Sequence, residues 1–552
     1  MTTKRENKWL ALLVLAGALA MIVLDGTIVG VSLPSMIQSL DMDLTSAQWV
    51  NSLYSVVLAA LLMTAGRLGD RVGRRRLLAI GVGIFVLGSL AAALATDATA
   101  LIAARALQGV GGAAVLPSTL SSVNSIFRGK ERAAAFGIWG AVMSGAAALG
   151  PLLGGAFTTY LDWRWIFWVN LPLGLLVLVG IWRLVPETTV EHREHGADIV
   201  GVLLSALGFG LLVFVLIEGP SWGWLAPKTA VELGPLTWDA DAPVSPIPIL
   251  GAISVGALIA FIRWELRRGR QLKSTLLDVS LFSHATFSWG NATATMVAMG
   301  EFGLLLVLPL YLINVLATDA MGAGLILTAM AAGAFLSGAM ARHLAASMGA
   351  DRVVVLGLGL EVAGVAALVW VIGAGAPLFP LVLLLVLYGL GLGLASAQLT
   401  STVLRDIPPE ASGQGSATQS TLRQLGSGFG TAIAGSVLAV ATTHAAAVSL
   451  AALEIPGLDA AAWAQRLSDS AGGLIPQVLH GNAGAAFGEH AAQVAGVMGD
   501  AFTRGVQAAM VAAVVCLAIG WVGSLQVSRA ARAVSVPDDA QVLTPEPEAE
   551  RG

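Results

Sequence analysis

Charged residues are scarce in this chain. Only 12% of its 552 residues are Asp, Glu, Lys or Arg, whereas 56% are hydrophobic. A soluble domain carries about 25% charged residues, so the composition excludes a globule coated by water and predicts an integral membrane protein. The net charge of −4 excludes nothing by itself, because the placement of charges matters more than their sum. Glycine is abundant, with 65 residues, which is typical of helices that pack closely in lipid.

The residues needed for several kinds of chemistry are also missing. A single cysteine, Cys516, excludes an intrachain disulfide and a cysteine-built metal site. None of the 7 histidines has metal-ligand spacing, and the phosphate-binding pattern G-x-x-x-x-G-K-[ST] is absent. No Ser-His-Asp assembly can be argued. The sequence therefore predicts neither an enzyme nor a metal or cofactor protein, and no patch for nucleic acid.

Long apolar stretches are plentiful. A spanning helix needs about 20 mostly apolar residues, and this criterion predicts fourteen spans. They cover residues 9–33, 48–66, 77–96, 100–123, 133–156, 165–185, 198–218, 247–265, 285–313, 321–342, 353–373, 378–402, 415–441 and 505–527. The first stretch is long enough to span and lacks a small-residue cleavage site, so a retained helix is expected instead of a cleaved signal peptide.

Lysine and arginine are concentrated on one side of this topology. If the N-terminus is cytoplasmic, the cytoplasmic segments hold 25 of the 30 lysines and arginines. Positive residues accumulate on the cytoplasmic side of membrane proteins. We therefore expect a multi-pass protein of the cell membrane with both termini in the cytoplasm.

A faint internal repeat predicts how the chain is divided. Gly338–Arg352, between the tenth and eleventh spans, resembles Gly66–Arg76, between the second and third. This pairs the last six spans with the first six, an arrangement typical of transporter folds with repeated halves. The expected units are a six-helix half at 1–190, an insert of two helices at 191–275, a six-helix half at 276–530 and a disordered tail at 531–552. The outer segments 219–246 and 442–500 are too polar to span and are expected to form caps or short interfacial helices.

The basic turn Gly66–Leu78 connects the second and third spans. It places five arginines around Asp70 and three glycines. The arginines hold the turn in the cytoplasm, the glycines let helix ends approach closely, and Asp70 can pair with an arginine or a helix N-terminus. An ordinary cytoplasmic loop would explain the arginines alone, but not the complete spacing.

An ionisable residue inside a span costs about 2.5–3.5 kcal/mol and indicates function, and four such residues stand out. Asp25 and Glu301 occupy corresponding positions in the two halves, so we expect them to face each other near the midplane. Arg105 lies in the fourth span and Glu361 in the eleventh. Desolvation disfavours a charged carboxylate, so such acids can exchange a proton for a cationic substrate. Glu361 could equally be a structural residue, because its helix need not line the cavity.

Two sequence patterns, the basic turn and the segment around Arg105, resemble motifs of the major facilitator superfamily. Gly66–Leu78 (G-R-L-G-D-R-V-G-R-R-R-L-L) matches the loop between its second and third helices. Leu101–Gly112 (L-I-A-A-R-A-L-Q-G-V-G-G) resembles its fourth-helix motif, whose arginine is implicated in proton transfer; Arg105 holds that place, with Gln108 beside it. The resemblance implies an all-α major facilitator fold that works by alternating access. It also implies a conformational latch made by Gly66, Asp70, Arg71, Gly73 and Arg74.

Other patterns resemble the fourteen-helix drug:proton antiporters. Gly145–Gly155 (G-A-A-A-L-G-P-L-L-G-G) resembles their fifth-helix motif, and ordinary glycine packing is the alternative. In this motif Pro151 weakens the helix, and Gly145, Gly150, Gly154 and Gly155 form a smooth face for rocking contact. Leu24–Pro34 resembles the first-helix motif, although Gly30 and Ser32 replace the usual asparagine and alanine. The segments Trp163–Gly174 and Gly413–Gly430 resemble the family's sixth and thirteenth helices.

The family resemblance implies proton-coupled efflux of amphipathic, cationic drugs or antibiotics. Asp25 and Glu301 would then be the substrate and proton carboxylates, Arg105 would modulate their charge, and Gln108 would line the cavity. The energy source would be the proton gradient, without a cofactor, and a monomer in lipid would suffice. The alternatives are an exporter dedicated to one endogenous metabolite, lipid or peptide, and a membrane-embedded enzyme or sensor. The last would need a polar catalytic constellation or a sizeable soluble module, and neither is visible.

Overall fold

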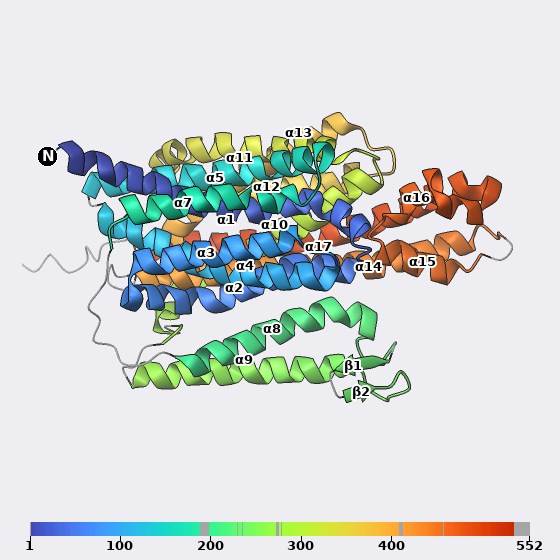
Figure 1. Cartoon of the computed structure of the whole chain (residues 1–552), viewed down its shortest axis with the longest axis horizontal. Helices are drawn as coiled ribbons and strands as arrows, with labels where there is room; N and C mark the ends of the chain where they lie inside the picture. The colour runs from blue at the N-terminus through green and yellow to red at the C-terminus, as the bar shows by residue number, and fades with distance from the viewer. Residues whose placement is uncertain are drawn as a thin grey trace, which may run out of the picture.

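The computed structural model describes residues 2–127, 129–187, 198–228, 230–233, 236–271, 275–277, 279–407, 412–455 and 458–534. Long helices lie side by side in one bundle (Figure 1). The helices of the first half are α1 (Thr2–Ser39), α2 (Leu44–Val72), α3 (Arg74–Ala93), α4 (Ala98–Ile126), α5 (Gly129–Tyr160), α6 (Trp165–Trp168) and α7 (Asn170–Leu184). The insert contains α8 (Ile199–Trp222), a hairpin of β1 (Val231–Leu233) and β2 (Leu236–Trp238), and α9 (Pro246–Arg270).

The second half begins after a 3-10 turn, η1 (Val279–Ser283). Its long helices are α10 (Ala285–Asn314), α11 (Ala320–Met348), α12 (Ala350–Val371), α13 (Leu378–Val403), α14 (Ser412–Ala451) and α17 (Ala491–Val534). Between the last two lie α15 (Ala460–Asp469), α16 (Leu474–His480) and the short turns η3 (Asn482–Ala486) and η4 (Gly488–His490).

The helices coincide with the predicted spans. Within the described residues, 12 helices are long and apolar enough to cross a membrane. Two more, α2 with 29 residues and α5 with 32, occupy the predicted spans at 48–66 and 133–156. Each predicted range therefore contains helix, although the sixth is divided between α6 and α7. The prediction of an all-α membrane fold is confirmed.

The two polar outer segments match their prediction in part, since α15 and α16 are short helices as expected for 442–500. The range 442–500 is not a separate loop, because α14 continues to Ala451 and α17 already begins at Ala491. Only α15, α16 and the short turns lie between them, and the Asn314 side chain donates a hydrogen bond of 2.9 Å to the Ala471 carbonyl. In the insert, a two-stranded hairpin stands where caps or short helices were expected. Both features lie at the same end of the bundle (Figure 1).

The two halves repeat one packing pattern. Equivalent helices pair in both halves: α3–α4, α2–α4 and α1–α5 of the first half correspond to α12–α13, α11–α13 and α10–α14 of the second, where α10 and α14 also pack on α17. The halves meet mainly where α5 packs on α11 and where α2 packs on α14, with a smaller contact between α1 and α10. The exact unit boundaries stay predictions, because 188–197 and 535–552 lie outside the described residues.

Two equivalent turns show the repeat at the backbone. Gly73 joins α2 to α3 with φ of 109°, and Gly349 joins α11 to α12 with φ of 94°. Glycine is favoured at both places because a side chain strains a backbone with positive φ. The spacing between these two glycines is the same as that between Asp25 and Glu301. The predicted correspondence of the turns therefore extends to their geometry.

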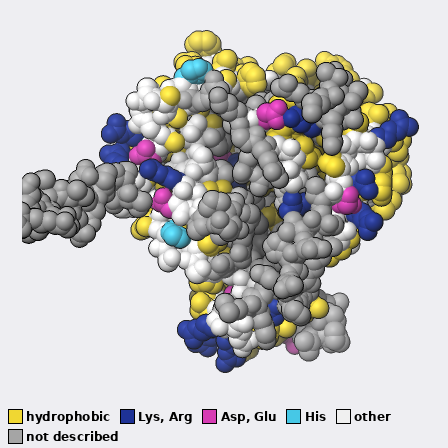
Figure 2. Space-filling model, turned by 90° about the vertical axis from the view of Figure 1, so that its left-hand side faces the viewer, with side chains coloured by type: hydrophobic (Ala, Val, Ile, Leu, Met, Phe, Trp, Pro, Cys, Tyr) yellow, Lys and Arg dark blue, Asp and Glu magenta, His cyan; other side chains and the backbone are white. Residues whose placement is uncertain are grey.

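The inserted helices α8 and α9 pack on each other, and α8 packs on the bundle, against α2 and α14. They lie along one side of it (Figure 1). The last turn of α9 carries Arg267, Arg268 and Arg270. Figure 2 shows Lys and Arg side chains around the rim of this end of the molecule, which also carries the N-terminus. This is the end that the lysine and arginine distribution in the sequence predicts to face the cytoplasm.

Candidate functional site

The first half contains a buried ionic cluster centred on Asp25 of α1, whose side chain is only 1% exposed. Arg105 of α4 forms an ion pair with Asp25 Oδ2 through Nη1. Gln108 Nε2 and Asn170 Nδ2 donate to Asp25 Oδ1 over 3.0 and 3.1 Å. Three donors thus satisfy this buried carboxylate.

Arg105 is fully buried, and like Asp25 it has several hydrogen-bond partners. Its Nη1 also donates to Gln108 Oε1 over 2.7 Å, and its Nε donates to the Val50 carbonyl over 3.2 Å. The guanidinium lies 4.2 Å from the centre of the Tyr54 ring, a contact that favours a desolvated cation. Gln108 is therefore a bridge between the two charges in this conformation.

A second cluster of charged residues lies in the other half, and its carboxylates have far fewer hydrogen-bond and ion-pair partners. Glu301 of α10 pairs with Arg423 of α14 over 3.4 Å, and the two side chains are 6% and 40% exposed. Glu361 of α12 is fully buried, and neither of its oxygens has a hydrogen-bond partner among the described residues. Glu301 and Arg423 are the charged groups within electrostatic reach of Glu361. Tyr388 of α13 faces the same group of charges.

Asp25 and Glu301 each have partners inside their own half, and the expectation that they face each other near the midplane stays a prediction. Asp25 is bonded to α4 and α7 inside its own half, and Glu301 is bonded to α14 inside the other. Each acid thus finds a cation within its own six-helix half. Of the four predicted ionisable residues, Asp25 and Arg105 are in direct contact, while Glu301 and Glu361 share the second cluster.

Asn170 and Arg423 join the clusters, although sequence analysis assigned them no role beyond belonging to the segments Trp163–Gly174 and Gly413–Gly430. Asn170 begins α7, directly after the break that follows α6, and also donates to Ser89. A polar side chain inside an otherwise apolar run was the available signal. Arg423 lies on the cytoplasmic side of the predicted thirteenth span, and nothing local indicates that it reaches Glu301.

The predicted latch is only partly visible. The side chains of Asp70 and Arg71 lie outside the described residues, so the pairing of that acid stays a prediction. Gly66 lies against Pro117 of α4, and Arg74 donates to the Ser121 carbonyl over 3.1 Å. The acid seen at the turn is one that sequence analysis missed, Glu187, which accepts from the Arg75 amide over 3.1 Å. It is placed there by the tertiary fold alone.

The glycine-rich helix α5 packs between the halves. A Cβ placed on Gly154 would lie 2.7 Å from the Ile28 carbonyl in α1, and one on Gly155 would lie 2.5 Å from the Ala320 carbonyl in α11. Gly150 meets Thr27 of α1, and the Pro151 carbonyl faces Gly324 of α11. The surroundings of Gly145 lie outside the described residues. Close backbone approach thus requires glycine along this part of α5.

The other main contact between the halves is polar. Ser52 of α2 shares a hydrogen bond of 2.7 Å with Thr431 of α14. Beside it, α8 binds both helices: Trp49 Nε1 donates to Glu218 over 2.9 Å, and Ser436 donates to the Leu216 carbonyl. These contacts lie toward the outer ends of α2 and α14 in the predicted orientation, so the halves are joined on that side.

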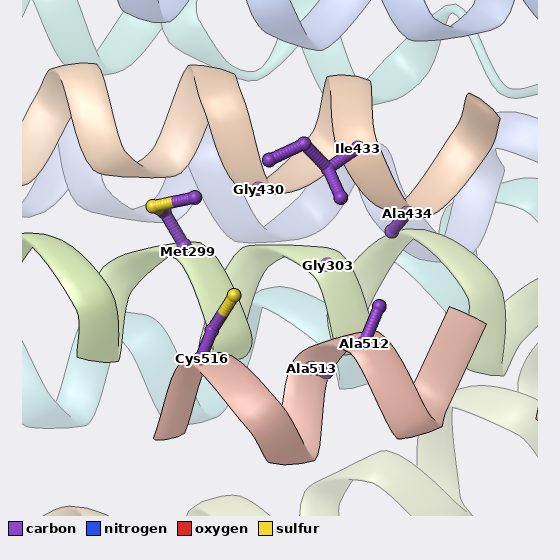
Figure 3. A pocket seen from close by; sticks show the side chains of 8 residues that line it. All are labelled: Met299, Gly303, Gly430, Ile433, Ala434, Ala512, Ala513 and Cys516. Carbon is purple, nitrogen blue, oxygen red and sulfur yellow. The ribbon is translucent and has the colours of Figure 1, made fainter. Parts of the chain in front are cut away.

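A small apolar cavity lies near Glu301, between α10, α14 and α17 (Figure 3). Its lining residues are Met299, Gly303, Gly430, Ile433, Ala434, Ala512, Ala513 and Cys516. The sulfur of Cys516 points toward α10 in this view. No charged side chain lines the cavity, so a charged substrate would find no partner in it.

The repeated halves, the charged residues buried between helices, and the glycine-rich and polar contacts between the halves define a membrane transporter. The Major Facilitator Superfamily profile matches residues 15–431, and the chain belongs to that superfamily. It is a transporter and not an enzyme. Among the described residues, no group of three His, Cys, Asp or Glu is placed to hold a metal ion.

Similar proteins are drug and antibiotic transporters. The chain is 34% identical over 435 residues to the multidrug resistance protein Stp of Mycobacterium tuberculosis, covering 79% of this chain and 76% of that protein. It is 33% identical over 440 residues to the puromycin resistance protein of Streptomyces alboniger, covering 79% and 83%. It is also 33% identical over 443 residues to the probable actinorhodin transporter of Streptomyces coelicolor, covering 78% and 72%.

Solved structures agree on the fold. A bacterial homologue of the human lysosomal transporter Spinster, solved in an inward-facing, unoccupied conformation, superposes with a TM-score of 0.60. The match covers 95% of this chain and 98% of that one at 15% sequence identity. An identity this low supports the fold alone.

Proposed function

We propose that this protein exports amphipathic, cationic drugs or antibiotics across the cell membrane in exchange for protons. The named relatives support efflux of antibiotic-like compounds. The buried acids support cationic cargo, because an uncompensated carboxylate in a low-dielectric interior attracts a cation or takes up a proton.

The observation that carries this proposal is the weakly paired Glu301. Its carboxylate is buried, yet its cation Arg423 is 40% exposed and 3.4 Å away. A partly exposed ion pair is worth only about 1 kcal/mol or less, so a hydrophobic cation that enters the same space can compete for Glu301. Asp25 offers no comparable opening, because Arg105 and two amides already surround it.

Alternating access would use the two main contacts between the halves. With α5 against α11 and α2 against α14, the protein is closed toward the predicted outer side. Tilting the halves about the glycine-rich contact and the polar contact would close the cytoplasmic side and release the substrate on the outer side. The turn containing Gly66, Asp70, Arg71, Gly73 and Arg74 would latch one of the two conformations. We propose both termini in the cytoplasm, a monomer as the working unit, and the proton gradient as the only energy source.

Everted membrane vesicles test this function. Adding ethidium to energised vesicles that contain the wild-type protein should release protons from the lumen, which a pH-sensitive dye detects. Glu301→Gln should remove this response, because a neutral amide cannot hold the cation. Glu265→Gln is the matched control, since Glu265 is 1% exposed but lies in the insert, hydrogen-bonded to the Leu277 amide. An unchanged response in Glu301→Gln would contradict the proposal.

A second candidate is an exporter dedicated to one self-made compound. The similarity to a probable actinorhodin transporter and to the tetracenomycin C resistance and export protein of Streptomyces glaucescens favours it. A panel of unrelated dyes and antibiotics separates the two functions. Transport of several scaffolds supports a multidrug pump, whereas transport of a single scaffold supports the dedicated exporter.

A further inference from the structure

Glu361 has an unusual environment for an acid. Its side chain is fully buried in α12, and neither carboxyl oxygen accepts or donates a hydrogen bond among the described residues. Of the surrounding helices, α10 contributes Glu301, α14 contributes Arg423 and α13 contributes Tyr388 to its electrostatic environment. No ionisable group of α11 or α17, within the described ranges, contributes to it.

The packing of the fold does not require an acid at this place. Comparison of the halves shows which residue occupies the equivalent position in the first. A Cβ on Gly391 of α13 would lie 2.6 Å from the Glu361 amide nitrogen, and one on Gly111 of α4 would lie 2.5 Å from the Phe85 amide nitrogen. The corresponding residue is therefore Phe85, which is fully buried. An apolar side chain satisfies the same packing, so the carboxyl group of Glu361 needs another explanation.

The balance of charge in the second cluster determines whether the Glu361 carboxyl group carries a proton. An ionised carboxylate without a partner is too costly to bury, and such a group binds a proton instead. With Glu361 neutral, the charges of Glu301 and Arg423 cancel and the cluster has no net charge. If a monovalent cation replaces Arg423 at Glu301, the cluster gains one positive charge. Loss of the proton from Glu361 restores neutrality and gives the displaced Arg423 a new carboxylate partner.

We propose that Glu361 holds the proton that is exchanged for a cationic substrate bound at Glu301, whereas Asp25 stays paired with Arg105. The inference rests on the proposed function and assigns its proton site. In the exchange step the O–H bond of the Glu361 carboxyl group breaks, the proton passes to water on the open side, and the electron pair stays on the carboxylate. No redox partner is needed.

Binding measurements on the purified protein test the assignment. Tetraphenylphosphonium, added to the protein in weakly buffered detergent solution, should release about one proton per cation bound. Its Kd should therefore fall about tenfold for each unit rise in pH over the range where the proton leaves. Glu361→Gln, which mimics the protonated acid, should still bind the cation but release no proton, with a Kd independent of pH. Glu265→Gln should behave as the wild type.

Infrared spectroscopy supplies a test that needs no substrate. The unliganded wild type should show the C=O stretch of a protonated carboxylic acid that is missing in both Glu361→Gln and Glu361→Leu. The apolar variant keeps the test valid should the amide disturb folding, because the fold accepts Phe85 at the equivalent position. Proton release by Glu361→Gln equal to the wild type, or no lost C=O band, overturns the assignment. A wild type that shows the band but binds no cation instead contradicts the proposed function.

Discussion

Removing the charge of Asp25 alone should strongly destabilise the protein. The Asp25→Asn variant leaves the Arg105 guanidinium fully buried with only Gln108, the Val50 carbonyl and the Tyr54 ring as partners. Breaking a buried ion pair from one side costs about 3–5 kcal/mol, because the remaining charge stays without compensation. Thermal and chemical unfolding in detergent micelles measures this loss.

The double variant Asp25→Asn with Arg105→Met decides whether charge is the cause. Removing both charges leaves no buried ion, so the remaining cost is the loss of hydrogen bonds to Gln108 and Val50, about 1 kcal/mol each. The double variant should therefore be more stable than Asp25→Asn, and a double-mutant cycle gives the coupling energy. Equal stability of Asp25→Asn and the wild type would show that Asp25 is not ionised and would refute the reasoning.

Three further predictions concern the second cluster and the contacts that close the outer side. Arg423→Gln should tighten ethidium binding about fivefold, since the cation no longer competes with a pair worth about 1 kcal/mol; weaker binding would exclude competition. Gly155→Val should favour the outward-open form, because its Cβ would meet a backbone carbonyl at 2.5 Å; spin-label distances between α5 and α11 measure this, and Gly251→Ala, which meets nothing within 4 Å, is the control. Glu218→Ala should shift the same equilibrium by about 1 kcal/mol, because it deprives the indole N–H of Trp49 of its acceptor; an unchanged distance between α2 and α14 would contradict it.

The sequence predicted those parts of the structure that depend on local pattern. Each span could be located, because a bilayer requires an apolar run of fixed length. The correspondence of Asp25 with Glu301 followed from the repeat. Arg105 was expected beside these acids and does pair with Asp25. The pairing of Glu301 with Arg423 could not be predicted, because the two residues are far apart in the sequence. Asn170 reaches Asp25 only because α7 packs on α1.

The helix ends in the outer segments could not be predicted from composition. The range 442–500 is rich in alanine and carries scattered charges, so hydropathy alone placed the end of the span too early. In the structure, packing of α15 on α14 and of Phe502 beside Gly472 stabilises helix beyond the apolar stretch. Tertiary contacts of this kind extend a helix past its hydrophobic limit.

Proteoliposomes give the most direct test of proton-coupled export. Purified wild-type protein, reconstituted with an imposed pH gradient, should move tetraphenylphosphonium against its concentration gradient while protons flow in the opposite direction. An ionophore that collapses the gradient should stop this movement at once. Accumulation of the cation that continues after the gradient is collapsed would contradict the account.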